Sequence, residues 1–371
     1  TTTSATTTST GSSSACMLNV PTSYDGSTFD ANAVEPLAVR SQLGAVNNLM
    51  KTAEADLGVI VTFDQLMTSY EAGAPSLRDV TSPYYDLVLL DVFAAFEAAG
   101  GNSFTAVDPP VGSGGKYGAY IFSERGVDLR QAFEKGEFQA ALFNYAQGLV
   151  QDKVTDQASL DALLAAYGAH PSFPGDSETT DPAVVPNPDR IGAQYAERRS
   201  PKEPSDSSLP LDPAAPGPYF RIKQHFIVAQ AAIAEGSACD AERDAAVEQI
   251  MREWEAVIAA TVIYYLNDAR TKLTKDNPTE ADLAGGLHGF GEGIAFLHGF
   301  RGLSPNLRTL SDSQIEEMLE ALGTPVAEPA SAHLLLIDPL THTASFQGVI
   351  DALASTFGFS AAEVEQFKTN F

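Results

Sequence analysis

Two side chains, four positions apart, form the pair in this sequence that is best suited to chemistry. His288 and Glu292 lie in the stretch ADLAGGLHGFGEGIAFLHGFRGL, residues 281–303. On a helix, side chains at positions i and i+4 meet on one face. Imidazole and carboxylate together suit iron, zinc or manganese. The spacing therefore predicts two metal ligands on one helical turn, and the alternative is a hydrogen-bonded pair inside a helical bundle.

A metal ion needs further ligands, which a second helix of a bundle can supply. Glu253 and Glu255 flank Trp254 and are the natural donors if the two long predicted helices pack together. They lie at different angles around the helix, so we expect one of them to face inward. Tyr265 is a reserve ligand, because tyrosine phenolates bind ferric iron. His298 lies on another face of the glycine-rich helix, and we expect it to be structural.

Other kinds of chemistry find less support in the sequence. It contains no Gly-x-Ser-x-Gly and no His-Glu-x-x-His motif. The glycine-rich stretch 107–120 lacks the lysine and hydroxyl pattern of a phosphate-binding loop, and we expect a plain loop. A site for bicarbonate or another small anion is a further alternative, with His225 or Arg301 in the pocket.

Charge and composition narrow the class of protein. The 371 residues carry a formal net charge of -26, which opposes binding to nucleic acid and to anionic membranes but attracts cations. No apolar run is long enough to span a bilayer. The first residue is Thr rather than Met, so we expect a leader to have been removed. The two cysteines, Cys16 and Cys239, either form one disulfide or are unrelated thiols.

The metal-binding pair requires a helix that tolerates six glycines between Gly285 and Gly299. Such a helix is stable only if other helices press closely on it. Gly285, Gly289 and Gly293 form a flat stripe where a neighbour can approach. Apolar periodicity and capping residues predict further helices over 34–55, from 62 onward, 83–98, 128–150 with a break at Gly136, 156–167, 219–235, 240–275, 311–322, 345–357 and 360–367.

These elements predict an all-α fold of two packed helical bundles. A Ser/Thr-rich flexible tail (1–19) precedes an N-terminal bundle (20–167), and a C-terminal bundle (219–371) carries the His/Glu helix. Between the bundles, 168–218 holds 11 of the 22 prolines and predicts a long irregular loop or linker. The apolar run 332–337 is the one convincing stretch of strand length.

Three stretches resemble a known superfamily. They are MREWEAVIAATVIYYLN from Met251, LHGFGEGIAFL from Leu287 and RGVDLRQAFEKG from Arg125. They are similar to a bacterial domain of the imelysin-like superfamily. Together with the Ser/Thr-rich start, they resemble the secreted iron-assimilating proteins of green algae, which high carbon dioxide induces. The resemblance covers most of the chain outside 168–218.

This resemblance implies an all-helical protein outside the plasma membrane, in an extracellular or periplasmic place, with a part in iron acquisition. It implies iron as the bound metal, with carbonate or bicarbonate as a conceivable co-ligand, and an iron-uptake partner at the cell surface. Imelysins carry a Gly-x-His-x-x-Glu motif. Gly286 and His288 match it, but Glu292 comes one residue late. The shift weakens the inference of a metallohydrolase and favours a non-catalytic iron-binding protein.

Overall fold

The chain folds almost wholly as helices. A computed structural model describes residues 16–175, 188–200 and 217–371; the predicted tail before Cys16 and two parts of the predicted proline-rich loop, 176–187 and 201–216, lie outside them. Helix accounts for 64% and strand for 3% of the structure, which confirms the all-α class. Among the described residues, no helix combines the length and apolar character needed to cross a membrane.

The N-terminal half packs helices around α2 and α6. Its elements are α1 (Phe29–Asn32), α2 (Val34–Ala55), α3 (Phe63–Tyr70), α4 (Leu77–Val80), α5 (Pro83–Ala99), the strands β1 (Gly115–Tyr117) and β2 (Tyr120–Phe122), α6 (Leu129–Glu137), a π-helical segment (Phe138–Phe143), α7 (Asn144–Gln151) and α8 (Gln157–Tyr167). The helix therefore continues through Gly136, where a break was expected, and changes to π-helical hydrogen bonding two residues later.

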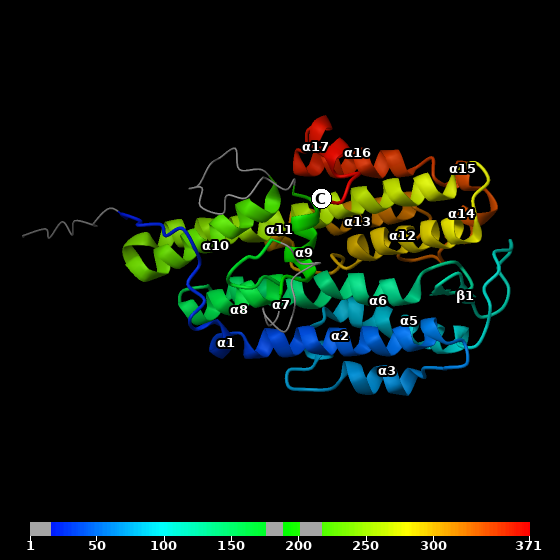
Figure 1. Cartoon of the computed structure of the whole chain (residues 1–371), viewed down its shortest axis with the longest axis horizontal. Coiled ribbons are helices and arrows are strands. Elements are labelled where there is room, and N and C mark those ends of the chain that lie inside the picture. The colour runs from blue at the N-terminus through cyan, green and yellow to red at the C-terminus, as the bar shows by residue number, and fades with distance from the viewer. Residues whose placement is uncertain (1–15, 176–187, 201–216) are drawn as a thin grey trace, which may run out of the picture.

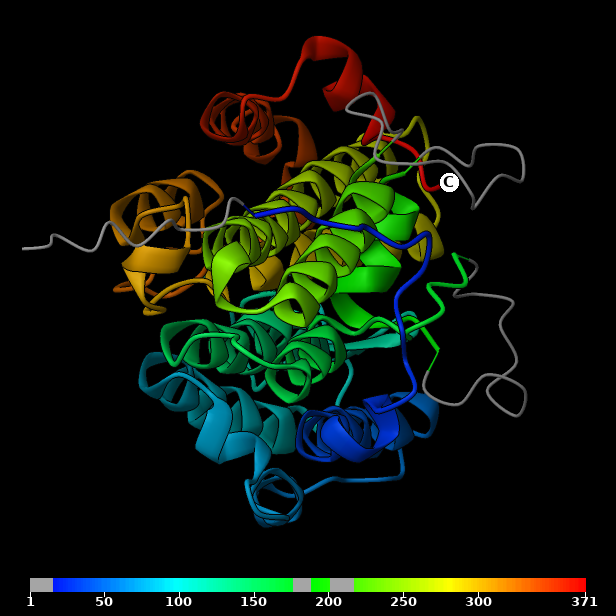
Figure 2. The same cartoon turned by 90° about the vertical axis from the view of Figure 1, so that its left-hand side faces the viewer.

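The C-terminal half is built on two long helices, α11 and α12. Its elements are α9 (Ile191–Arg198), α10 (Pro218–Glu235), a 3₁₀ turn (Ser237–Cys239), α11 (Asp240–Leu273), α12 (Glu280–His298), a second 3₁₀ turn (Pro305–Leu307), α13 (Asp312–Ala321), α14 (Leu334–Ile337), α15 (Pro339–His342), α16 (Phe346–Phe357) and α17 (Ala361–Gln366). The long helices run along the length of the molecule in layers, from α2 through α6 to α10–α12 (Figures 1 and 2).

Side-chain caps begin many of these helices. Six of them start with a reciprocal capping box, in which a side chain at the N-cap and one three residues later each bond the other's backbone N–H; the N-caps are Thr62, Ser76, Asp156, Thr279, Ser311 and Ser360. Such caps satisfy backbone donors that the first helical turn leaves open. Local sequence therefore determined where these helices start.

One apolar core joins the two predicted halves. The buried Trp254 of α11 packs edge-on against Phe143 of the π-helical segment and Tyr167 of α8, with ring centroids 5.0 and 5.3 Å apart. The cluster of buried apolar residues is continuous from Tyr24 to Phe367. The two halves are therefore packed against each other, while the division into two bundles stays a prediction.

Three local predictions differ from the structure. The run 332–337 is not a strand but leads into the helical turn α14, because His333 N–H bonds the Arg125 carbonyl and the chain then coils. The predicted loop 107–120 contains most of a β-hairpin, in which Gly115 pairs with Phe122 and Tyr117 with Tyr120.

The third difference is α9, which interrupts the predicted irregular loop 168–218. Tyr195 of this helix is buried and packs edge-on against Phe296 of α12, with ring centroids 4.9 Å apart. Tertiary packing thus stabilises a helix in a segment whose prolines predict a loop.

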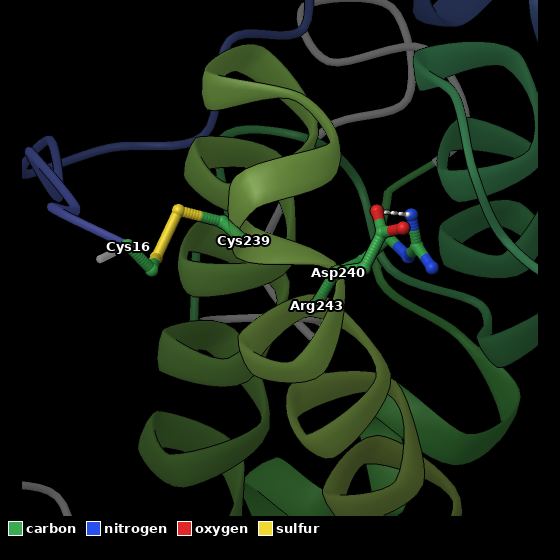
Figure 3. The surroundings of a disulfide bond; sticks show 4 residues. All are labelled: Cys16, Cys239, Asp240 and Arg243. Carbon is green, nitrogen blue, oxygen red and sulfur yellow. Dashed lines mark hydrogen bonds and ion pairs between the residues drawn. A yellow bond between two sulfur atoms is a disulfide. The ribbon is translucent and has the colours of Figure 1, made fainter. Parts of the chain in front are cut away.

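The two cysteines are joined in a disulfide, one of the two possibilities that the sequence left open. Cys16 bonds Cys239, 223 residues away, at the turn between α10 and α11 (Figure 3). Close by, Arg243 forms an ion pair with Asp240 at 2.6 Å. The disulfide ties the first described residue to the start of the longest helix.

Candidate functional site

Helix α12 presents His288 to the N-terminus of α6. His288 Nδ1 lies 2.8 Å from Oδ2 of Asp128, a fully buried residue that also caps α6 by accepting a hydrogen bond from Gln131 N–H at 2.9 Å. The approach depends on Gly291, where a Cβ atom would lie 2.7 Å from the Asp128 Cβ. Sequence reasoning missed Asp128, because an aspartate at an N-cap looks like an ordinary cap.

The β-hairpin fixes the plane of the imidazole. The ring of Tyr120, on β2, stacks on that of His288 with centroids 3.8 Å apart and planes 7° apart. Asp128 holds one ring nitrogen and Tyr120 covers one face. His288 is therefore held in a single orientation, with Nε2 as its remaining polar atom.

Glu292 lies one turn further along α12 and faces Nε2. Its Oε2 is 3.7 Å from His288 Nε2, and its Oε1 is 3.5 Å from the Nζ of Lys135, on α6. Within the described part of the chain, no hydrogen bond ends on this carboxylate, although only 8% of the residue is exposed. The structure thus brings the predicted pair together and leaves Glu292 held by charge alone.

A network of charged side chains extends behind this pair. Arg130 donates to Glu54 Oε2 at 2.6 Å and to Glu134 Oε2 at 3.0 Å. Lys135 Nζ lies 3.2 Å from Glu134 Oε2. Asn47 joins the network through Glu134 at 2.8 Å.

This His288 cluster, defined as Asp128, Glu54, Glu134, Glu292, Arg130, Lys135 and His288, has more negative than positive charge. It holds four carboxylates against two permanent cations. Uncompensated charge is expensive to bury. A bound cation or bound protons must therefore offset part of it.

The shifted pKa values show where protons bind. Burial lowers the pKa of His288, but the hydrogen bond and charge of Asp128, together with Glu292, outweigh it and the pKa is raised. Burial and the neighbouring Asp128 raise the pKa of Glu54 to about 7, against the opposing effect of Arg130. Burial lowers the pKa of Lys135, yet Glu134, Tyr195 and Glu292 raise it overall, so this ammonium stays charged.

Tyr265 lies in the same neighbourhood. Its Cβ faces Gly293 across the α11–α12 contact, and its hydroxyl is 3.5 Å from that of Tyr195. Burial, Tyr195 and Glu292 all raise the pKa of Tyr265. The ammonium of Lys135 lies 5.6 Å from the centre of the Tyr195 ring. Tyr265, the reserve ligand, is thus close enough to Glu292 for the charge of Glu292 to shift its pKa.

Glu255 and Glu253, by contrast, do not join His288. Glu255 is fully buried and accepts hydrogen bonds from the backbone N–H groups of Thr309 and Leu310, at 2.5 and 2.9 Å. Glu253 binds Arg221 through two hydrogen bonds of 2.8 Å each.

The antiparallel packing of α11 and α12 explains why Glu255 lies far from His288. Tyr265 is the residue of α11 that lies opposite Gly293. Glu255 precedes Tyr265 by ten residues, about 15 Å along the helix. It therefore lies beyond the last turn of α12, beside the loop that follows that helix.

The anion-site candidates lie elsewhere as well. Arg301 forms ion pairs with Asp312 at 3.0 Å and with Glu316 at 2.6 Å. His225 is on α10, where burial lowers its pKa against the opposing charge of Glu253. In the described part of the chain, neither residue contacts His288 or Glu292. His298, expected to be structural, is half-buried and hydrogen-bonded to the Tyr84 hydroxyl at 2.8 Å.

The number of ligands at His288 is small. Among the described residues, one group of three possible ligand atoms comes within 4.8 Å of one another, and it consists of Cys16, Cys239 and Glu242. Its two sulfurs form the disulfide, so it is no metal site. His288 Nε2 and Glu292 Oε2 would therefore bind an ion as a pair, with water or another small ligand completing the coordination.

Comparison with protein-family models, with curated proteins and with solved structures found no match. The function of the protein therefore has to be argued from the geometry and charge of the site.

Proposed function

We propose that this protein is a secreted, non-catalytic iron-binding protein that acts in iron assimilation, with His288 and Glu292 as its metal ligands. The observation that carries the proposal is the buried excess of negative charge around an oriented imidazole. Four carboxylates and two permanent cations surround His288. A divalent or trivalent cation would neutralise that excess.

The arrangement of the two ligand atoms fits this role. Two ligands, each about 2.1 Å from one tetrahedral ion, are about 3.4 Å apart. Nε2 and Oε2 are 3.7 Å apart, so a side-chain movement of a few tenths of an ångström suffices. The hydrogen bond that the other ring nitrogen, Nδ1, donates to the Asp128 carboxylate is the usual support of a metal-bound histidine.

Iron is the metal we propose, because nitrogen and carboxylate ligands suit it and because the sequence resembles iron-assimilating proteins. Burial, Tyr195 and Glu292 raise the pKa of Tyr265, and its phenol stays a reserve ligand. The Lys135 ammonium faces Glu292 and could hold a carbonate co-ligand.

The disulfide supports a place outside the cell, and the net charge supports the binding of cations. A disulfide such as Cys16–Cys239 persists in oxidising compartments. The net charge of -26 raises the local concentration of cations around the protein. We propose that a partner at the cell surface receives the iron.

Iron titration of purified protein at near-neutral pH tests the proposal. We expect about one iron per chain in the wild type, and at least about a 100-fold loss of affinity in the double variant His288→Gln, Glu292→Gln. The matched control is His298→Gln, which removes a half-buried histidine from the same helix without touching the site. Circular dichroism checks that each variant remains helical.

Two results would refute the site. Either the double variant binds iron as tightly as the wild type, or all binding disappears in moderate salt. The second result would mean that the acidic surface alone attracts the metal.

A further inference from the structure

A cavity lies away from the His288 cluster, where the end of α7, α11 and the loop after α12 meet. Its volume is about 480 Å³, within the range of roughly 300–1,000 Å³ typical of pockets for small ligands. Figure 2 views the molecule from the end at which α10 connects to α11, and the cavity lies along the first half of α11.

The wall formed by α7 and α11 is apolar at its base. Val154, Val247 and Met251 line it and are 3%, 4% and 1% exposed. Leu307, from the loop after α12, lines the opposite side. The apolar side chains of the lining that are still partly exposed are Val150 and Leu307. They suit an aliphatic or aromatic ligand body, because covering them removes apolar surface from water.

The loop wall is held rigidly in place. Glu255 binds the backbone N–H groups of Thr309 and Leu310. Arg308 donates to the carbonyls of Leu303 and Leu310, at 3.2 and 2.7 Å. The cavity is therefore formed before any ligand arrives, and a ligand loses little affinity to reorganisation of the protein.

Lys153 gives the rim an unbalanced positive charge. The four other charged residues of the lining, Asp244, Glu248, Arg252 and Arg308, have ionic partners. Arg252 pairs with Glu248 at 2.7 Å, and Asp244 with Arg243 at 2.7 Å. Arg308 pairs with Asp312. In the described part of the chain, Lys153 makes no ion pair, although the chain as a whole carries a net charge of -26.

The backbone at Lys153 is also unusual. Its φ is +69°, a left-handed conformation that is less favourable for a residue with a side chain than for glycine. A glycine would be the stable choice at this helix end.

We propose that this cavity binds a small amphipathic monoanion, a ligand with an apolar body and a single carboxylate, of the size of a medium-chain fatty acid. The apolar body would lie against Val150 and Leu307, and the carboxylate would pair with Lys153. The cavity is separate from the His288 cluster, so the proposal does not depend on iron binding.

Calorimetric titration with sodium octanoate tests the proposal, with 1-octanol as the uncharged probe and with metal-free protein. We expect one saturable octanoate site per chain. Lys153→Gln should weaken octanoate about 5- to 20-fold, as the loss of one charge-assisted contact does, and should leave 1-octanol unchanged. Leu307→Trp, which fills the cavity from its loop side, should abolish both. The matched control is Lys275→Gln, which removes an exposed lysine that pairs with Asp282.

Lys153→Gly separates the ligand role from folding. Because glycine relieves the left-handed backbone, we expect this variant to melt at a higher temperature than the wild type, while it loses octanoate affinity by the same factor as Lys153→Gln. The proposal is overturned if octanoate shows no saturable binding at millimolar concentration. It is also overturned if Leu307→Trp or Lys153→Gly binds octanoate as the wild type does.

Discussion

Glu255 and Glu292 are both buried carboxylates on neighbouring helices, yet their surroundings are opposite. Glu255 accepts hydrogen bonds from two backbone N–H groups. Glu292 has charged neighbours at 3.5 and 3.7 Å and, within the described residues, no hydrogen bond. A carboxylate whose bonds are complete anchors a loop. One that is buried with its bonds incomplete is available to a ligand.

Glu137 adds a third case to this comparison. It is fully buried, and the Thr81 hydroxyl donates to its Oε2 at 2.8 Å. Burial raises the pKa of Glu137 to about 8, so this acid is neutral at physiological pH. The protein thus accommodates buried carboxylates in three ways, through backbone donors, through a charged cluster and through protonation.

The largest effect is expected at Arg130, which balances the charge of the His288 cluster. Arg130→Met would leave Glu54 and Glu134 without their shared cation and should lower the free energy of unfolding by about 3–5 kcal/mol. Urea denaturation measures it. Adding Glu54→Gln should recover part of the loss, because it removes one unpaired carboxylate.

Arg78→Met is the control for that change. Arg78 also bridges two acids, Glu71 and Asp86, but its side chain is 36% exposed against 8% for Arg130. Its loss should cost less than about 1 kcal/mol. Equal losses in the free energy of unfolding at the two arginines would mean that the ion pairs of the buried cluster contribute no more to stability than those at the surface.

Glu137→Gln should change how stability depends on pH. The folded pKa of about 8 is above the unfolded value of 4.5, so the stabilising form is the protonated one. Its contribution is complete below pH 4.5 and is lost as pH rises through 8. The glutamine variant cannot ionise, and at pH 9 it should be more stable than the wild type by roughly 2–4 kcal/mol, since one pKa unit is about 1.36 kcal/mol. Urea denaturation at pH 5 and pH 9 measures the difference, and identical pH slopes would contradict it.

Glu255→Gln tests the comparison with Glu292, and its expected effect on stability is smaller. Its amide can satisfy one backbone N–H but presents its own donors to the other, so we expect a loss of about 1–3 kcal/mol in the free energy of unfolding. Hydrogen exchange at Thr309 and Leu310 should become faster. Iron stoichiometry should stay at the wild-type value, and a loss of iron binding would return Glu255 to the metal site.

Much of the helical framework could be predicted from the sequence, because its signals are local. Apolar periodicity and caps placed α2 at Val34–Ala55 and began α5 at Pro83. The run 332–337 has the length of a strand but contains the helical turn α14, because a short apolar run has no periodicity that separates strand from helix. Helix α9 was missed, because its stability comes from Tyr195 packing on Phe296 rather than from its flanking sequence.

The candidate site also has parts that could be predicted from the sequence and parts that could not. The spacing of His288 and Glu292 predicted that their side chains would meet, and they do. Asp128 is 160 residues away from His288 and meets it only through the packing of α6 on α12. Tyr120, Arg130 and Lys135 come from elements whose contact with α12 no local pattern reveals. Glu255 was wrongly placed with them, because the sequence does not give the register between α11 and α12.

The Cys16–Cys239 bond divides the chain into a closed ring and an open arm. Residues 16–239 form a covalent circle, and residues 240–371, with both α11 and α12, hang outside it. Closing a circle of that length lowers the entropy of the unfolded chain by the equivalent of about 5 kcal/mol. Asp128, Arg130 and Lys135 belong to the circle and His288 and Glu292 to the arm. A molecule pulled by its two ends would therefore extend the arm first, separating the two halves of the site while the circle remained intact.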